Sequence, residues 1–244
     1  MPAEIRACLF DLDGVLTQTD LIHIAAWQEM FDAFLRQRAT RTGQPFIPFD
    51  PASDYGRYVD GKPRADGARS FLASRAIELP EGSDDDDRAT ETVRALSDTK
   101  NAIVLRRIAQ DGVQAYPGSV RYLRAVMAAG RKCAVVSASA NCRAVLAATG
   151  LIDNFQVVVD AAVTDRERLH GKPAPDTYLA AARMLDVPPA AAAVYEDAQA
   201  GVAAGRAGGF GWVVGVDRIG QADALWREGA DVVVHDLAEL TSDE

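Results

Sequence analysis

Six short apolar runs are the feature of this 244-residue chain that most restricts its fold. The runs are apolar on both faces, which suits buried parallel strands better than half-exposed antiparallel ones. Segments with helical patterns separate them, and several of these segments end in glycine, as helices often do. The alternation predicts a doubly wound, Rossmann-like parallel α/β sheet. We expect strands at residues 5–10, 133–136, 157–159, 192–195, 212–216 and 231–234, and helices at 120–129, 142–148, 176–185, 202–207 and 222–228.

The long segment after the first run breaks this rhythm, because it has no convincing buried strand. It carries helical patterns instead, such as Trp27, Phe31 and Phe34, which are spaced to share one helix face. We therefore expect two domains. An α/β catalytic core is formed by residues 1–19 and 113–244, and residues 20–112 form an inserted α-helical domain.

Composition and charge argue against several classes of protein. The formal net charge of −9 disfavours a nucleic-acid or membrane partner, because phosphate groups select basic surfaces. No run of about 18 apolar residues is present, and the first strand begins too early to leave room for a signal peptide. These features predict a cytoplasmic protein. Cys8, Cys133 and Cys142 are odd in number, and the first two adjoin apolar runs, so we expect buried thiols rather than disulfides.

Polar residues follow three of the expected strands directly. In a parallel sheet these strand ends lie on one edge, which is where open α/β sheets bind ligands. Each acidic pair alone could be an ordinary helix cap or turn, but carboxylates after separate strands should converge. The residues concerned are Asp11 and Asp13, then Ser137, Ser139 and Asn141, and then Glu196 and Asp197.

Four converging carboxylates repel one another, so a hard cation should hold them together unless some are protonated. Mg²⁺ is the expected cation, because it prefers oxygen ligands and an oxyanionic substrate. Ser137, the backbone N–H groups of residues 137–139 and Lys172 then supply donors and a positive charge for a phosphate. The sequence therefore predicts a phosphoryl-transfer site.

Four motifs resemble those of the haloacid dehalogenase superfamily, in the same order and at suitable separations. They are DLDGVLTQT at 11–19, SAS at 137–139, GKPAPD at 171–176 and EDAQAG at 196–201. Within the superfamily the chain is most similar to the beta-phosphoglucomutase group, whose early His-x-x-x-Trp pattern matches His23 and Trp27. The core resemblance covers residues 5–19 and about 116–240, and the inserted segment resembles the group's helical cap more loosely.

The resemblance implies a role for each core residue. Asp11 would be the nucleophile that forms an aspartyl-phosphate, and Asp13 would be the general acid and base. The implied ligands of Mg²⁺ are Asp11, the backbone carbonyl of Asp13, Glu196 and Asp197. The implied binding groups for the transferring phosphoryl group are Ser137, the backbone of Ala138, Asn141 and Lys172.

For the cap, the resemblance implies that Thr19 and His23 couple cap closure to acid/base positioning, although Thr19 could simply cap a helix and His23 could be structural. Arg64 matches the arginine with which the group's cap holds the non-transferring phosphate. The chain departs from the group at Asp60, where the better-known members have lysine. Either Lys62 supplies that charge, or Asp60 accepts hydrogen bonds from sugar hydroxyls, or the substrate differs.

The implied reaction is the beta-phosphoglucomutase reaction, from β-glucose 1-phosphate to glucose 6-phosphate through the 1,6-bisphosphate. A sugar-phosphate phosphatase, in which water takes the phosphoryl group from Asp11, is the main alternative, and a non-catalytic sugar-phosphate-binding protein is another. A true dehalogenase fits less well, because Asp13 and the full acidic set suit phosphate chemistry. We expect Mg²⁺ as cofactor, a small-molecule sugar phosphate as substrate and a monomer, with no nucleic-acid or membrane partner.

Overall fold

The computed structural model describes residues 1–83, 85–87 and 89–241, and the chain divides into two compact units. The first unit comprises Met1–Gln18, Gly61–Pro63 and Val113–Glu244, and the second comprises Thr19–Asp60 and Arg64–Gly112. The sequence-based division differs in two details, since it had assigned Thr19 to the core and residues 61–63 to the inserted domain.

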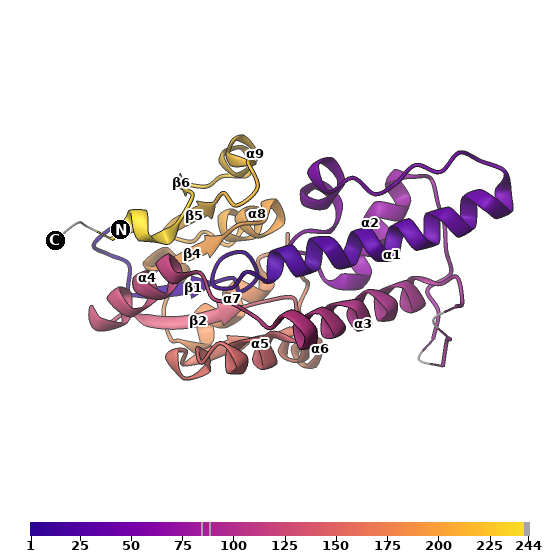
Figure 1. The fold of residues 1–244 in the computed structure, drawn as a ribbon. Coiled ribbons are helices and arrows are strands. Elements are labelled where there is room, and N and C mark those ends of the chain that lie inside the picture. Colours follow the sequence, from indigo (N-terminus) through magenta and orange to yellow (C-terminus); the bar gives the residue numbers. More distant parts are fainter. Residues whose placement is uncertain (84, 88, 242–244) are drawn as a thin grey trace. The chain divides into compact units, whose positions relative to one another are not determined.

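The first unit is built on a six-stranded parallel sheet with the strand order β3-β2-β1-β4-β5-β6 (Figure 1). Its strands are β1 (Ala7–Phe10), β2 (Lys132–Val136), β3 (Val157–Val159), β4 (Ala192–Glu196), β5 (Trp212–Val216) and β6 (Val232–Val234). All six apolar runs therefore form strands, and the doubly wound fold class is confirmed. The strand order reverses beside β1, which is the kind of switch point where such sheets bind ligands.

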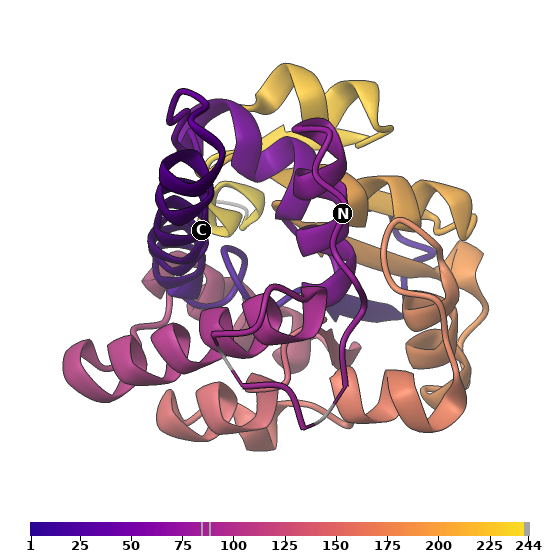
Figure 2. The ribbon, with the colours of Figure 1, turned by 90° about the vertical axis from the view of Figure 1, so that its right-hand side faces the viewer.

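Helices cover the sheet, and its central strand, β1, is therefore buried on both faces. Leu9 belongs to an apolar cluster with residues of α7 and α8, which lie next to each other and are orange in Figure 2. Phe10, the next residue, contacts Tyr122 of α4 instead. The helices of this unit are α4 (Pro117–Ala128), α5 (Cys142–Ala148), α6 (Ala161–Glu167), α7 (Asp176–Met184), α8 (Gln199–Ala207) and α9 (Ala222–Arg227), with short 3₁₀ helices at Ile152–Asn154, Pro189–Ala191 and Leu237–Leu240.

The second unit is helical in the part that the structure describes, as expected. It consists of α1 (Thr19–Thr42), a π-helix at Pro51–Val59, α2 (Arg64–Ser74) and α3 (Val93–Asp111). An aromatic cluster forms its core, because Trp27 and Phe31 stack with ring centres 5.2 Å apart and Phe31 contacts Phe71 at 4.1 Å. The side chain of Thr92 caps α3 by accepting a hydrogen bond from the backbone N–H of Ala95.

All three cysteines are buried and reduced, as predicted. Cys8 and Cys133 occupy paired positions on β1 and β2. Burial raises the pKa of the Cys8 thiol to about 11 and that of Cys133 to about 12, and it also raises the pKa of Cys142. Among the described residues, no helix has both the length and the apolar character needed to cross a membrane.

Candidate active site

Three carboxylates from two strand ends meet at the edge of the sheet. Asp11 directly follows β1, and its N–H donates to the carbonyl of Tyr195 in β4 over 2.9 Å. This register brings Asp11 level with Glu196 and Asp197, and one oxygen of each of the three carboxylates lies within 4.8 Å of the others. All three residues are buried, with Glu196 fully inaccessible to solvent. Three of the four carboxylates that were predicted to converge therefore lie together.

Two glycines leave room for these carboxylates. A Cβ atom at Gly14 would lie 1.8 Å from Asp197 Oδ2, and one at Gly201 would lie 1.8 Å from Glu196 Oε1. Gly14 also has a φ angle of +82°, which favours glycine for a second reason. The carboxylates thus sit in a space that side chains would otherwise fill. A compact set of oxygen donors such as this fits a hard divalent cation of the Mg²⁺ type.

Lys172 supplies positive charge within the cluster. Its Nζ lies 2.5 Å from Asp11 Oδ1 and 2.5 Å from Glu196 Oε1, and it also donates to the carbonyl of Val136 over 3.2 Å. Burial alone would lower the pKa of this ammonium group, but the two carboxylates outweigh that effect and raise it. One ammonium group cannot balance three carboxylates, so the site has a residual negative charge that a bound cation would offset.

Asp11 itself has a pKa well above its usual value. Burial is the largest cause, and the nearby charges of Glu196 and Asp13 add to it, whereas Lys172 acts in the opposite direction. Asp13 lies close to the end of β2, since Ser137 Oγ is 3.4 Å from Asp13 Oδ2. Asp13, the fourth predicted carboxylate, thus lies beside Ser137 of the SAS motif. The other three carboxylates form the compact cluster.

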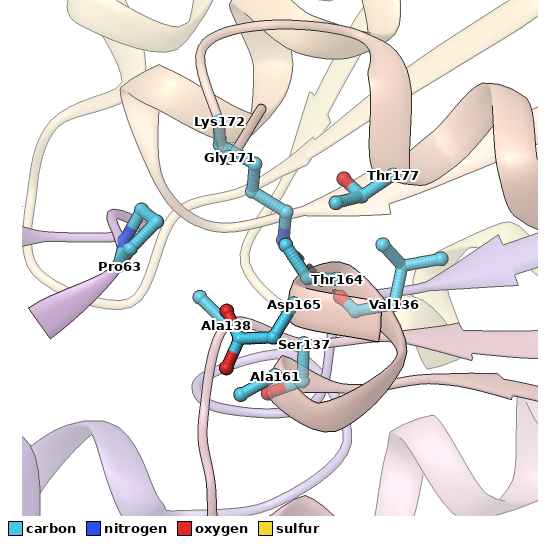
Figure 3. A pocket seen from close by; sticks show the side chains of 10 residues that line it. All are labelled: Pro63, Val136, Ser137, Ala138, Ala161, Thr164, Asp165, Gly171, Lys172 and Thr177. Carbon is cyan, nitrogen blue, oxygen red and sulfur yellow. Dashed lines mark hydrogen bonds between the residues drawn. The ribbon is translucent and has the colours of Figure 1, made fainter. Parts of the chain in front are cut away.

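A cavity of about 60 Å³ opens beside the Lys172 side chain (Figure 3). Ser137, Ala138 and Lys172, three of the predicted phosphate-binding residues, line it. The backbone N–H of Ser139 donates to Ser137 Oγ over 3.1 Å, and that of Asn141 donates to Ser139 Oγ over 3.2 Å, so hydroxyl groups order this loop. Asn141 follows the loop without lining the cavity. The other lining residues are Pro63, Val136, Ala161, Thr164, Asp165, Gly171 and Thr177.

In the second unit, His23 of α1 has a close partner on α3. Lys100 Nζ lies 2.6 Å from His23 Nδ1, and the same ammonium lies 4.9 Å from the ring centre of Trp27. If Lys100 donates its proton, Nδ1 must accept, which places the imidazole proton on Nε2. Thr19, the first residue of α1, is also buried. Lys100 was not predicted as a site residue from the sequence. The rarity of lysine was a signal that could have drawn attention to it, since only four of the 26 basic residues of the chain are lysines.

Arg64 is the first residue of α2, and its Nη1 is buried with no hydrogen-bond partner among the described residues. Burial lowers the pKa of the guanidinium group. Such an unsatisfied charged donor favours an anion as its partner. Asp60, in the same unit, is buried at the end of the π-helix, where its N–H donates to the carbonyl of Tyr55. Lys62 belongs to the first unit.

The parallel sheet and the carboxylate cluster at its edge are typical of phosphoryl-transfer enzymes. The family model described as haloacid dehalogenase-like hydrolase matches residues 5–209, and the chain belongs to this family. It is also 59% identical over 243 residues to the beta-phosphoglucomutases of Mycobacterium bovis and Mycobacterium tuberculosis, an alignment that covers 98% of this chain and 93% of theirs.

Solved structures give the same assignment. The beta-phosphoglucomutase of Clostridium difficile matches with a TM-score of 0.74 and 28% identity, covering 97% of this chain and 93% of that one. A hydrolase from Pseudomonas syringae matches with a TM-score of 0.77 and 25% identity, covering 96% and 95% of the two chains. The resemblance identified from the four motifs is therefore confirmed.

Proposed function

We propose that the protein is a Mg²⁺-dependent beta-phosphoglucomutase that converts β-glucose 1-phosphate to glucose 6-phosphate through the 1,6-bisphosphate. The observation that carries this proposal is the 59% identity to beta-phosphoglucomutases over nearly the whole chain, both units included. The site geometry supports the chemistry independently, because a buried carboxylate, an ammonium group and further carboxylates meet around Asp11.

Asp11 is the nucleophile in this proposal. Its carboxylate oxygen bonds to phosphorus, the bond from phosphorus to the sugar oxygen breaks, and an aspartyl-phosphate results. Asp13 gives the leaving oxygen a proton and later takes one from the hydroxyl of the accepting sugar. When bound by Asp11, Glu196, Asp197 and the carbonyl of Asp13, Mg²⁺ supplies positive charge for the carboxylates and the phosphoryl oxygens.

Lys172 binds the transferring phosphoryl group together with Ser137, the N–H of Ala138 and Asn141. The ammonium already lies between Asp11 and Glu196, so a small movement directs one of its protons to a phosphoryl oxygen. Donors already held at the position where negative charge develops are the main source of rate enhancement in such transfers.

Arg64, in the helical cap unit, is the proposed partner of the second, non-transferring phosphate. A mutase must bind two phosphates and keep water from the aspartyl-phosphate, and the unsatisfied guanidinium donor of Arg64 is suited to the second one. Thr19 and His23 contribute to acid/base positioning on closure of this cap. At the position where the better-known members carry lysine, Asp60 accepts from sugar hydroxyls or Lys62 supplies the charge.

One assay separates this function from its rivals. Purified protein with Mg²⁺ receives β-glucose 1-phosphate and a trace of the 1,6-bisphosphate, and glucose 6-phosphate and free phosphate are followed together. We expect glucose 6-phosphate with little free phosphate, and neither product from Asp11→Asn. Rapid phosphate release without isomerised sugar would instead identify a phosphatase. Absence of both products would refute this reaction and point to a sugar-phosphate-binding protein or to an enzyme for a different sugar phosphate.

The remaining expectations concern the substrate, the cellular location, the oligomeric state and the partners. We expect the protein to act on a small sugar phosphate as a cytoplasmic monomer, without nucleic-acid or membrane partners. Light scattering at assay concentration, with and without the bisphosphate, checks the oligomeric state.

A further inference from the structure

Tyr178 is a fully buried tyrosine whose hydroxyl points at the carboxylate cluster. It lies in the first turn of α7, and its OH donates to Glu196 Oε1 over 2.7 Å. Its ring contacts Phe210 at 6.0 Å between centres, and Lys172 Nζ lies 5.0 Å from the ring centre. The ring is therefore fixed by packing on its faces and edges while the hydroxyl serves a single carboxylate.

Glu196 depends on a small number of donors, because no part of it reaches solvent. Its Oε1 receives hydrogen bonds from Tyr178 and from Lys172, and its Oε2 receives one from the N–H of Ala198 over 3.2 Å. A buried carboxylate that loses a donor is strongly destabilised or changes its orientation. The tyrosine hydroxyl is thus one of the groups that decide where the Glu196 oxygens point.

The two donors to Oε1 differ in one respect. Lys172 is shared with Asp11, and in the proposed reaction it turns towards the phosphoryl group. The Tyr178 hydroxyl makes no other hydrogen bond among the described residues, so its donation does not have to change during turnover. It can keep Glu196 in place while Lys172 changes partners.

We propose that Tyr178 is a positioning residue that orients Glu196 for divalent-metal binding and leaves Lys172 free to serve the phosphoryl group. This inference rests on the proposed metal-dependent function. Hydrogen bonds to metal ligands from such outer groups typically contribute about 10- to 100-fold in metal affinity or activity.

The test compares two buried tyrosines that undergo the same chemical change. Tyr178→Phe removes only the hydroxyl and keeps the ring packing. Tyr195→Phe is the matched control, because Tyr195 is also fully buried and adjoins Glu196 in sequence, yet its hydroxyl pairs with Cys8 and Tyr122. Binding of Mn²⁺ is followed by electron paramagnetic resonance of the free ion, and Mg²⁺ affinity is obtained by competition.

We expect the Kd for both ions to rise about 10- to 100-fold in Tyr178→Phe and to stay unchanged in Tyr195→Phe. The kcat of Tyr178→Phe should fall at limiting Mg²⁺ and recover as Mg²⁺ is raised. Circular dichroism and urea unfolding verify that both variants fold. Metal affinity equal to the wild type in folded Tyr178→Phe overturns the inference, and so does an equal loss in both variants.

The metal titration needs no sugar phosphate. A wild-type protein without mutase activity would therefore refute the proposed function while the comparison of Tyr178→Phe with Tyr195→Phe still judges the role of the hydroxyl. Conversely, unaltered metal binding in Tyr178→Phe leaves the mutase proposal standing.

Discussion

Gly201 approaches the carboxylate of Glu196 so closely that a Cβ atom on it would lie 1.8 Å from Glu196 Oε1. The glycine is in the first turn of α8, whose remaining small residues pack against β4 and β5. The structure shows that its missing side chain is part of the space in which Glu196 sits.

We expect Gly201→Ala to lower Mg²⁺ affinity and turnover about 10- to 100-fold, because the new methyl group must displace Glu196, a proposed metal ligand. Gly205→Ala on the same helix is the control, since the nearest neighbours of its Cβ would be the side chains of Val194 and Val213, at 3.3 Å. Steady-state kinetics across a Mg²⁺ series compare the two. Equal behaviour of the variants would show that the contact with Glu196 is unimportant.

Lys172→Met should remove both catalysis and much of the apo-state stability. Turnover is expected to fall about 100- to 1,000-fold through loss of a charged donor. Unfolding free energy without Mg²⁺ should fall by about 3–5 kcal/mol, because Asp11 and Glu196 lose their buried partner. Urea unfolding with and without Mg²⁺ measures this, and added Mg²⁺ should recover part of the loss.

Lys132→Met is the control for that experiment. Lys132 is exposed at the start of β2, and its Nζ donates to a backbone carbonyl, that of Leu185, rather than to a carboxylate. Its loss should leave the kinetics and the Mg²⁺ dependence of stability unchanged. A similar Mg²⁺ response in both lysine variants would argue against a special role for Lys172.

Arg64→Ala should raise the KM for the 1,6-bisphosphate about 10- to 100-fold, the value expected when a charged hydrogen bond is lost. The exposed Arg57 in the π-helix provides the comparison as Arg57→Ala. Initial rates over a range of bisphosphate concentrations give the result. An unchanged KM in Arg64→Ala would mean that the second phosphate binds elsewhere.

The contact between His23 and Lys100 predicts non-additive kinetics. His23→Ala and Lys100→Met should each lower kcat, and the double variant should be no worse than the poorer single one, because each change removes the same hydrogen bond. A double-mutant cycle on kcat measures the coupling. Fully additive losses would indicate that the two residues act independently.

Much of the core could be predicted because its signals are local in sequence. A strand buried on both faces is almost wholly apolar, so β1 and β4 were evident. Acidic residues marked the site where these apolar runs end, with Asp11 directly after β1 and Glu196 as the last residue of β4. Once the strands are parallel, their carboxyl ends share an edge, which brings these residues together without knowledge of the helices.

The residues that sequence reasoning missed act through contacts between distant segments. Lys100 meets His23 from 77 positions away, and nothing near either residue indicates the pairing. Tyr178 is spaced like any core aromatic of α7, so its hydroxyl bond to Glu196 could not be distinguished from packing. Gly201 was identified in its motif, but its proximity to a side chain requires coordinates.

The burial of Cys8, Cys133 and Cys142 has a practical consequence. Thiols with raised pKa values and no solvent contact react slowly with maleimides, because the thiolate is the reactive form. The native chain can therefore serve directly as a low-background host for fluorophores. One cysteine introduced on each unit would allow the distance between the units to be followed by energy transfer during turnover, with every native thiol retained.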